Sequence, residues 1–304
     1  MTQRSHRLAA IDIGSNTLKL TIADVSEESV TPVTSRADVV LLGKGLAQTG
    51  AIELARIDHA LEILASYVRL VNEHDAVHMS AIATEAVRIA RNGASFISRI
   101  QTDLGVAVEI VSGEREGQLT TTGVLSQLDG RGSLLIVDIG GGSTELVRTV
   151  DGKITTLTSL PVGSGSQTDR FVRSNPPDSF ALDQIENETD RIVAPFLGTV
   201  DTSSRLVIVG GVGEFLARAV SGHAPLPVTA LDVARERVLM TTAEDLAPVL
   251  GTSVDRARVV PAGFAIARAV ARIAKPCALE TVNNGIRIGM LIELARKMDE
   301  TPES

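Results

Sequence analysis

Two short segments of the chain share one pattern of apolar and polar positions. Each begins with an apolar run, continues through Asp-Ile-Gly into small polar residues, and then turns apolar again: AAIDIGSNTLKL at 9–20 and IVDIGGGSTEL at 136–146. Asp12 aligns with Asp138 and Gly14 aligns with Gly140. This pattern is typical of a strand, a tight turn and a second strand, so we predict two β-hairpins, each with an acid at the end of its first strand.

The order of strands and helices around the two hairpins also repeats. In the first half, periodicity predicts strands at 21–25, 77–84 and 106–111, a helix at 52–71 and another from Glu85. In the second half it predicts strands at 145–150, 153–160 and 205–210, and helices at 178–196, 212–220 and 261–274. Both halves are therefore α/β. We predict two similar lobes with both hairpins at the floor of a cleft between them, where ligands commonly bind.

No low-complexity linker separates the halves. The most loop-like segment lies near 125–132 and contains QLDGRGS. We accordingly divide the chain into an N-terminal lobe at 1–126 and a C-terminal lobe at 127–304.

Composition and charge narrow the function classes. The 304 residues carry a net charge of −8 and contain one cysteine, one tyrosine and no tryptophan. The negative charge and the scarcity of base-stacking aromatics argue against a nucleic-acid partner. A single cysteine excludes an internal disulfide and a CxxC metal site, so a metal would be hard and bound by oxygen. With no membrane-length apolar stretch and no secretory signal, we expect a cytoplasmic protein with no membrane partner.

The glycine-rich turns are candidate phosphate sites. Without Cβ atoms, backbone amides can converge on an anionic oxygen, and Ser or Thr hydroxyls add donors. A single turn of this kind is equally well explained as a tight hairpin. Three successive glycines, Gly140, Gly141 and Gly142, are harder to explain in that way because each costs conformational entropy on ordering. They favour a large anionic ligand.

Several charged residues could serve phosphate chemistry. Asp138 and Glu145 of the second hairpin suggest Mg²⁺ held by one or two acids, although Glu145 could be an ordinary exposed strand residue. EIVSGEREGQL at 109–119 opens a helix with acids, which could be dipole partners or could supply a base for an attacking water. TEAVRIARNG at 84–93 predicts a helix with Thr84 as N-cap and with Arg88 and Arg91 on one face, either gripping phosphate or solvated.

GGVGEF at 210–215 follows the predicted strand at 205–210. A strand-glycine-helix junction of this kind contacts phosphate or nucleoside groups. It lacks the spacing of a Rossmann fingerprint or a Walker A loop, which disfavours an NAD enzyme and a P-loop ATPase.

The ordered motifs resemble one known family across nearly the whole chain. IDIGSNTLKL, TEAVRIARN, VSGEREGQL, VDIGGGSTEL, LPVGS, RARVVPAGFAIA and NNGIRIGML are similar to motifs of the exopolyphosphatase and guanosine pentaphosphate phosphohydrolase (Ppx/GppA) family. The resemblance implies two duplicated actin-like, ribonuclease H-like lobes of the ASKHA fold with an active-site cleft between them. It also implies the short form without a C-terminal helical domain, and a C-terminal helix at about 285–298 that packs back on the first lobe.

The resemblance also implies roles for residues. Glu116 matches the family's catalytic carboxylate, which orients or activates water, and Arg88 matches an arginine of the active-site cleft. Asp138 and Glu145 match acids associated with Mg²⁺, with Mn²⁺ as the alternative metal. The matches to the two phosphate-binding hairpins are Asp12, Gly14, Ser15, Asn16 and Thr17 in the first, and Gly140, Gly141, Gly142, Ser143 and Thr144 in the second.

At two positions the chain departs from the family. Leu41 and Ser166 stand where many members carry arginine, and Arg170, Lys44 or Arg287 are candidates to compensate. The leading hypothesis is a homodimeric, Mg²⁺-dependent exopolyphosphatase acting on inorganic polyphosphate. Conversion of pppGpp to ppGpp is the first alternative, and an ATP-dependent kinase or ATPase and a nucleotide sensor without turnover are the others.

Overall fold

The computed structural model describes residues 5–27, 29–197, 204–220, 225–283 and 285–300. Contacts divide the chain into two compact units: Met1–Gln127 with Asn284–Ser304, and Leu128–Asn283. Each unit contains a five-stranded mixed sheet flanked by helices. Asn284 of the NNGIRIGML motif lies outside the described residues.

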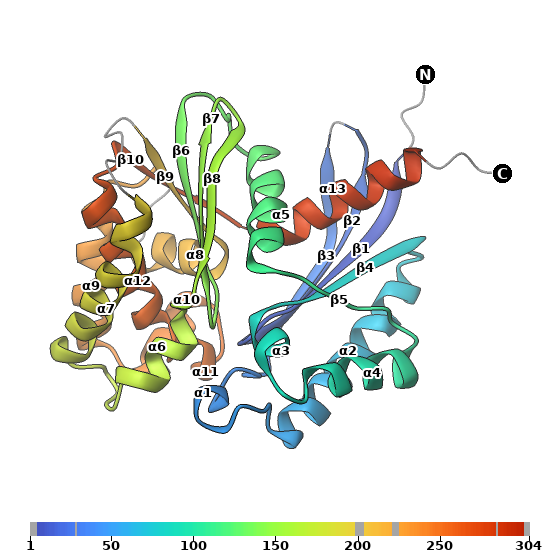
Figure 1. The fold of residues 1–304 in the computed structure, drawn as a ribbon, viewed down its shortest axis with the longest axis horizontal. Helices are drawn as coiled ribbons and strands as arrows, with labels where there is room; N and C mark the ends of the chain where they lie inside the picture. The colour runs from blue at the N-terminus through green and yellow to red at the C-terminus, as the bar shows by residue number, and fades with distance from the viewer. Residues whose placement is uncertain (1–4, 28, 198–203, 221–224, 284, 301–304) are drawn as a thin grey trace. The chain divides into compact units, whose positions relative to one another are not determined.

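The first unit is assembled from both ends of the chain (Figure 1). Its strands are β1 (His6–Ile13), β2 (Thr17–Val25), β3 (Val30–Val39), β4 (His78–Ala83) and β5 (Glu109–Ile110). Its helices are α1 (Leu46–Thr49), α2 (Leu54–Glu73), α3 (Glu85–Ile89), α4 (Gly93–Leu104), α5 (Gly113–Leu125) and α13 (Gly285–Glu300).

The second unit is continuous in sequence. Its strands are β6 (Ser133–Ile139), β7 (Thr144–Val150), β8 (Lys153–Leu160), β9 (Arg205–Val209) and β10 (Ala278–Val282). Its helices are α6 (Ser164–Phe171), α7 (Ser179–Leu197), α8 (Gly210–Ala219), α9 (Ala230–Met240), α10 (Ala243–Leu250), α11 (Val254–Ala257) and α12 (Val260–Ala274).

The two sheets have one topology. Their strand orders are β3-β2-β1-β4-β5 and β8-β7-β6-β9-β10. In each, the first three strands pair antiparallel and the other pairs are parallel. The hairpins predicted at 9–20 and 136–146 are confirmed as β1–β2 and β6–β7, so the sequence repeat is a structural repeat as well.

The first sheet separates two apolar layers. Side chains alternate between the faces of a strand, so Ala9, Ile11 and Ile13 of β1 face one layer, with Leu64 of α2 and Phe96 of α4. Leu8 and Ala10 face the other layer, which α5 and α13 supply with Leu119, Ile288 and Leu291. Asp12 follows Leu8 and Ala10 in this alternation and therefore lies on the same face of the sheet as α5 and α13.

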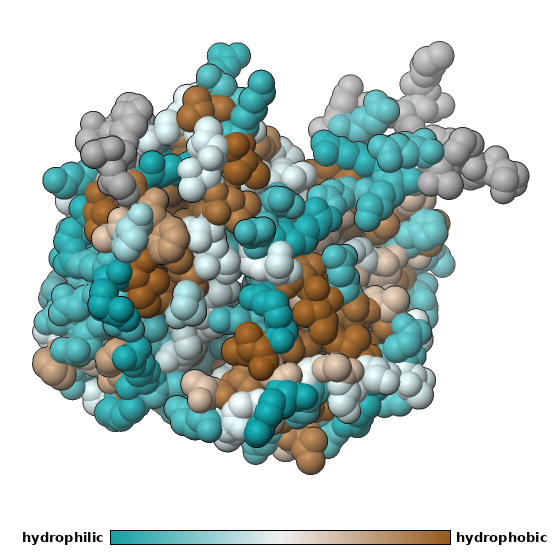
Figure 2. Space-filling view, viewed as in Figure 1, coloured by the Kyte–Doolittle hydropathy of each residue, from teal (hydrophilic) through white to brown (hydrophobic). Residues whose placement is uncertain are grey.

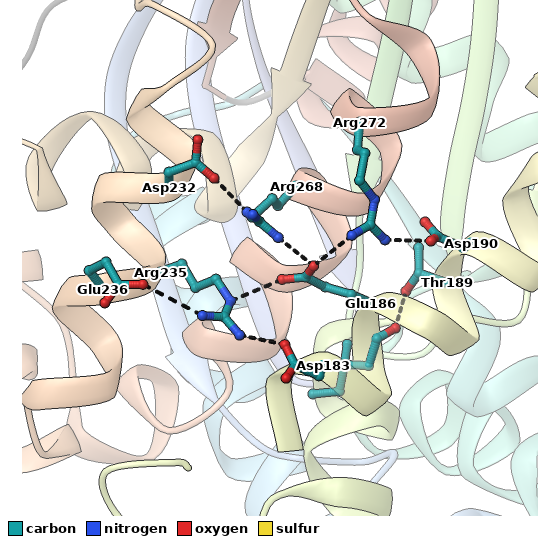
Figure 3. Close-up of polar contacts among 10 residues, drawn as sticks. Asp183, Glu186, Thr189, Asp190, Asp232, Arg235, Glu236, Arg268 and Arg272 are labelled. Carbon is teal, nitrogen blue, oxygen red and sulfur yellow. Dashed lines mark hydrogen bonds and ion pairs between the residues drawn. The ribbon is translucent and has the colours of Figure 1, made fainter. Parts of the chain in front are cut away.

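A network of charged side chains ties three helices of the second unit together (Figure 3). Glu186 of α7 is 2% exposed, and its carboxylate accepts hydrogen bonds from Arg235 Nε of α9 at 3.2 Å and from Arg268 and Arg272 of α12 at 2.5 and 3.3 Å. The same arginines also contact Asp183, Asp190, Asp232 and Glu236. Since buried carboxylates persist only when they are paired, these contacts explain why an acid is stable at this position.

Several elements differ from the sequence-based expectation. The strand expected at 106–111 is only β5, Glu109–Ile110. The helix from Glu85 ends at Ile89, and α4 begins at Gly93. Thr84 occupies the N-cap position of α3, but its hydroxyl forms no cap and donates instead to the carbonyl of Ile13 at 3.4 Å. The strands β3 and β10 and the helices α1, α6, α9, α10 and α11 were not predicted.

Candidate functional site

The turns of the two hairpins have the same internal geometry. The amide of Gly14 donates to the carbonyl of Thr17 at 3.2 Å, and the amide of Gly140 donates to the carbonyl of Ser143 at 2.9 Å. A Cβ atom on Gly14 or Gly140 would lie 3.0 or 3.1 Å from those same carbonyl oxygens. That spacing is tighter than nearly all real Cβ contacts, so close approach of the backbone explains the glycine in each turn.

A neighbouring loop supports the first turn. The carbonyl of Asn16 accepts hydrogen bonds from the amides of Val40 and Leu41, both at 3.0 Å, and the carbonyl of Ser15 accepts one from Gly43 at 2.8 Å. The Ser15 hydroxyl accepts a hydrogen bond from the amide of Ala86, at the start of α3, at 3.2 Å. The turn is therefore held by its carbonyls and by one hydroxyl.

The N-terminus of α6 supports the second turn in the same way. The carbonyl of Gly140 accepts hydrogen bonds from the amide and hydroxyl of Ser164 at 2.9 and 3.0 Å. The carbonyl of Gly141 accepts from the amides of Gly165 and Ser166 at 2.8 and 3.0 Å. In a trans peptide the N–H points opposite to the carbonyl, so the amides of Gly141 and Gly142 point away from α6.

These outward amides make the second turn a candidate anion site. Among the described residues, the amides of Gly141 and Gly142 donate to no backbone carbonyl. Successive backbone N–H groups left free on one side of a turn form a concave site that suits phosphate oxygens. By the same peptide geometry, the amides of Asn16 and Thr17 point away from the loop that supports the first turn.

The supporting segments are functional elements that the sequence alone did not reveal. In LLGKG and LPVGSGS, Leu41 and Ser166 replace arginine, and both residues bond through their amides to the turns. A Cβ on Gly163 would lie 2.6 Å from the Gly141 carbonyl carbon and from the Gly142 nitrogen. The glycine after Pro161 and Val162 was the available signal, because such contact demands a residue without a side chain.

Asp138 and Glu145 face each other across the second hairpin. They are register partners in β6 and β7, which places their side chains on the same face of the sheet. Glu145 is 3% exposed and accepts a hydrogen bond from the hydroxyl of Ser159, its register partner on β8, at 2.7 Å. The possibility that Glu145 is an ordinary exposed strand residue is therefore wrong.

The corresponding position of the first hairpin is different. Asp12 is the register partner of Lys19, and their charged groups are 3.7 Å apart. The first hairpin therefore pairs an acid with a base, whereas the second sets two carboxylates opposite each other. Directly opposed like charges destabilise a sheet, and a hard cation bound by carboxylate oxygens would offset that repulsion.

The donor set of the second hairpin fits Mg²⁺. Within the described ranges, no group of three or more His, Cys, Asp or Glu residues could hold a metal. Mg²⁺ commonly binds through one or two carboxylates and keeps the rest of its shell for water and substrate phosphate oxygens. The pair formed by Asp138 and Glu145 is compatible with that kind of site.

Glu116 and Arg88 form an ion pair within the first unit. Ser112 caps α5 by accepting a hydrogen bond from the amide of Arg115 at 3.2 Å, and Glu116 follows in the first turn with 8% exposure. Nη1 of Arg88 donates to Glu116 Oε1 at 2.9 Å and to the carbonyl of Val111 at 2.6 Å. Glu116 is therefore a buried, directed carboxylate rather than a solvated partner of the helix dipole.

Arg91 does not join Arg88. Helix α3 ends at Ile89, and the guanidinium of Arg91 donates to the carbonyl of Thr49 at 2.7 Å. The prediction that Arg88 and Arg91 share one helix face is wrong, because the helix ends before the second arginine.

Figure 2 shows apolar residues gathered over the region of α3 and β5, where Ile89 and Ile110 are 58% and 41% exposed.

Glu85 is a second carboxyl close to these groups. It precedes Ala86, whose amide bonds to the first turn. Burial raises the pKa of Glu85, and the positive charge of Arg88 partly opposes that rise. Nothing in the sequence distinguishes Glu85 from an ordinary acid in the first turn of a helix.

The second unit places GGVGEF beside its acids. The strand-glycine-helix junction is present, but helix α8 begins at Gly210, two residues before the predicted start, and a Cβ on Gly210 would be 3.7 Å from Asp138 Oδ1. At the next residue, a Cβ on Gly211 would be 2.6 Å from the guanidinium of Arg256, which stacks on the ring of Phe215. The junction therefore packs closely between an acid and a cation, and a side chain at Gly211 would collide with Arg256.

The first unit thus brings together the first turn, Asp12, Arg88 and Glu116. The second unit brings together the second turn, Asp138 and Glu145. Outward amides and two acids in one unit, with a buried carboxylate in the other, are groups of the kind that phosphoryl transfer to water uses. That both sets act on one ligand remains a prediction.

Comparisons with known proteins agree on one family. The model of the Ppx/GppA phosphatase family matches residues 21–298. The proteins named exopolyphosphatase 1 from Mycobacterium tuberculosis and Mycobacterium bovis are 28% identical over 307 residues, which cover 96% of this chain and 88% of theirs.

Solved structures show the same fold. A Ppx/GppA family member from Aquifex aeolicus superposes with a TM-score of 0.80 at 26% identity, covering 98% of this chain and 100% of its own. An exopolyphosphatase from Cytophaga hutchinsonii superposes with a TM-score of 0.88 at 24% identity, covering 96% and 98%. Among the helices that the structure describes, none has both the length and the apolar character to cross a bilayer.

Proposed function

The chain belongs to the Ppx/GppA phosphatase family, and from that premise we propose that it is an exopolyphosphatase. In this proposal it removes terminal orthophosphate from inorganic polyphosphate by metal-assisted attack of water. The observation that carries the proposal is the second hairpin, where two outward amides lie beside two opposed carboxylates. The names of the mycobacterial relatives support polyphosphate as the substrate.

The two turns bind the phosphate chain. Amides of Gly141 and Gly142 in the second turn, and of Asn16 and Thr17 in the first, donate to nonbridging oxygens, and the hydroxyls of Ser143 and Thr144 are further candidate donors. The turns are held from behind by their carbonyls, so little reorganisation is needed when substrate binds. Such preorganisation contributes most where negative charge develops in the transition state.

Asp138 and Glu145 would hold Mg²⁺, or Mn²⁺ as the alternative. The chemistry that such a metal would supply is neutralisation of phosphate charge and polarisation of the scissile phosphoanhydride. Ser159 fixes the Glu145 carboxylate through its hydrogen bond at 2.7 Å. Asp12, which is paired with Lys19, organises the first turn and is not the base.

Glu116 is the general base. Its carboxylate takes a proton from water as the water oxygen attacks the terminal phosphorus, and the bond from that phosphorus to the bridging oxygen breaks. The electron pair of that bond leaves on the shortened chain, and the proton on Glu116 is returned to solvent. Arg88 donates a hydrogen bond to the Glu116 carboxylate and fixes its orientation during the attack.

A pair of glutamate substitutions tests the base. We expect Glu116→Gln to lower kcat for phosphate release by about 100-fold or more, since it keeps the shape and removes the base. Glu114→Gln is the matched control, because it makes the same change at an exposed position in the same helical turn. A Glu116→Gln variant that releases phosphate as fast as the Glu114→Gln variant would remove Glu116 from the mechanism.

Chelation tests the metal. We expect removal of divalent ions to abolish release and added Mg²⁺ to restore it, and we expect Asp138→Asn to raise the Mg²⁺ concentration needed for half-maximal rate. Equal rates in chelator and in Mg²⁺ would contradict the metal assignment.

Hydrolysis of pppGpp to ppGpp is the second candidate. The observation that favours it is the stack of Arg256 on the Phe215 ring beside Gly211, where a cation and an aromatic ring could contact a nucleotide. Assaying phosphate release from long-chain polyphosphate and from pppGpp side by side separates the two. Transfer from ATP to an acceptor would indicate a kinase, and binding without turnover would indicate a sensor. We further propose that the enzyme acts in the cytoplasm as a homodimer.

A further inference from the structure

Helices α5 and α13 of the first unit cross with their backbones in contact; Figure 1 shows them side by side. A Cβ on Gly123 of α5 would overlap the carbonyl oxygen of Gly285 and lie 3.0 Å from the nitrogen of Gly289. A Cβ on Gly289 would overlap the carbonyl oxygen of Leu119. Small residues spaced four apart on one helix face permit such an approach, and any larger side chain would force the helices apart.

The contact continues to the first turn of α5. The contacts run in antiparallel order: each residue four positions earlier in α5 contacts a residue four positions later in α13. Gly123 lies at Gly285, Leu119 lies at Gly289, and Arg115 pairs with Glu293. Arg115 Nη1 donates to Glu293 Oε1 at 2.9 Å, and Nη2 donates to Oε2, which makes the pair bidentate. Arg115 directly precedes Glu116.

Helix α13 is itself anchored to the sheet. Arg287 is 7% exposed and donates to the carbonyl of Leu20 at 3.0 Å and to the hydroxyl of Thr21 at 2.8 Å, both on β2. Ile288 and Leu291 pack with Leu8 of β1. Since α13 is fixed to the strands, its glycines and Glu293 provide a fixed reference for α5.

Because Glu116 is part of α5, a displacement of α5 also displaces the Glu116 carboxylate. Glu116, Leu119 and Gly123 are spaced i, i+3 and i+7 and therefore lie on one stripe of α5. A shift of α5 by about 1 Å would stretch the 2.9 Å bond between Glu116 and Arg88 beyond hydrogen-bond range.

We propose that the C-terminal helix positions the proposed catalytic base, with Gly289 and Glu293 as positioning residues that act through α5 on Glu116. The proposal rests on the role given to Glu116 above. When these contacts are removed, the Glu116 carboxylate would still accept a proton, but its position and orientation would no longer be fixed. The effect should therefore fall on kcat and leave KM and the pH dependence of the rate close to those of the wild type.

Glu293→Ala in the full-length protein tests this, with Glu300→Ala as the matched control. Glu300 is an exposed acid on the same helix, beyond the contact with α5. In Glu293→Ala we expect amide hydrogen exchange at 113–117 to quicken and kcat to fall by about tenfold, with KM within about twofold of wild type. Arg115→Glu combined with Glu293→Arg reverses the pair and should recover most of kcat.

Coupling to Glu116 is tested in the Glu116→Gln background. If Glu293 acts through Glu116, adding Glu293→Ala there should lower the residual rate little further. The inference is overturned if exchange at 113–117 is unchanged in Glu293→Ala, if exchange quickens while kcat stays at the control value, or if the loss is the same in both backgrounds.

Failure of the proposed function gives a different result. It would be shown by wild-type protein that releases no phosphate from polyphosphate or pppGpp, or by a fully active Glu116→Gln. Either result overturns the catalytic part of this inference together with the proposed function. The exchange rates at 113–117 would still decide whether α13 orders the first turn of α5.

Discussion

Gly163 is the position where adding one methyl group should disturb the proposed phosphate site most. Its Cβ would lie 2.6 Å from the carbonyl carbon of Gly141 and from the nitrogen of Gly142, whereas ordinary contact begins at 3.4 Å. Both obstacles are backbone atoms, which cannot rotate away as the end of a side chain can. The second turn and the N-terminus of α6 must therefore separate by about 1 Å.

That separation acts on the bonds that hold the turn. The amide of Gly165 bonds to the carbonyl of Gly141 at 2.8 Å, and Ser164 bonds to the carbonyl of Gly140 at 2.9 Å. Lengthened by about 1 Å, both exceed hydrogen-bond range. We expect Gly163→Ala to lose about 1–3 kcal/mol of unfolding free energy from overpacking. We also expect kcat/KM for polyphosphate to fall about 100-fold, because the N–H groups of the second turn would no longer point at the phosphate oxygens.

Gly152→Ala separates these two effects. Gly152 lies in the β7–β8 turn of the same unit with φ of +75°, and its Cβ would meet nothing within 4 Å. Alanine there costs about 1–2 kcal/mol because left-handed backbone disfavours a side chain, but it leaves the second turn untouched. Urea unfolding measures stability, and phosphate release measures kcat/KM. If folded Gly163→Ala has the same kcat/KM as Gly152→Ala, the support role of α6 is refuted.

Three further results are expected. Glu186→Ala should lower the free energy of unfolding by about 1.5–3 kcal/mol, because it removes a buried acid shared by three arginines, each of which keeps only a more exposed acidic partner. Asp183→Ala, which removes an exposed partner of Arg235, should cost less than about 1 kcal/mol in the same denaturant experiment; equal losses would show that burial is not what matters. Arg88→Lys should keep more kcat than Arg88→Ala, because both bonds of Arg88 come from one nitrogen, Nη1, and an ammonium nitrogen carries donors for two acceptors; equal losses in the two variants would contradict this. Burial raises the pKa of Glu85 in the folded protein, so the folded state holds its proton more tightly and the contribution of Glu85 to stability falls as pH rises above 4.5. Between about pH 4 and 7, the unfolding free energy of Glu85→Gln should therefore fall less steeply than that of wild type, and parallel pH profiles would exclude the effect.

Elements with strong periodicity could be predicted, and elements without it could not. The hairpins, α2, α7, α8 and α12 follow from apolar spacing. Strand β3 was missed because it lies at the edge of its sheet, where most of its side chains are exposed and no alternation marks it. Helix α9 was missed since its apolar residues form only a weak stripe, and it is held partly by Arg235 bonding to Glu186 of another helix.

Residue types and spacing by themselves determined that two Asp-Ile-Gly hairpins repeat, and that acids and glycines converge at their ends. Alternation along a strand also set which face each acid occupies. These features are local, because a strand's period and a glycine's missing side chain act over a few residues.

Only the tertiary structure decided what supports and directs those groups. It paired Asp12 with Lys19 but set Asp138 opposite Glu145, and it turned the glycine amides outward by bonding their carbonyls to distant segments. It also laid a helix from the end of the chain against the one that carries Glu116. Such contacts depend on register and on approach between segments far apart in sequence, and a one-residue slip would have reversed the faces.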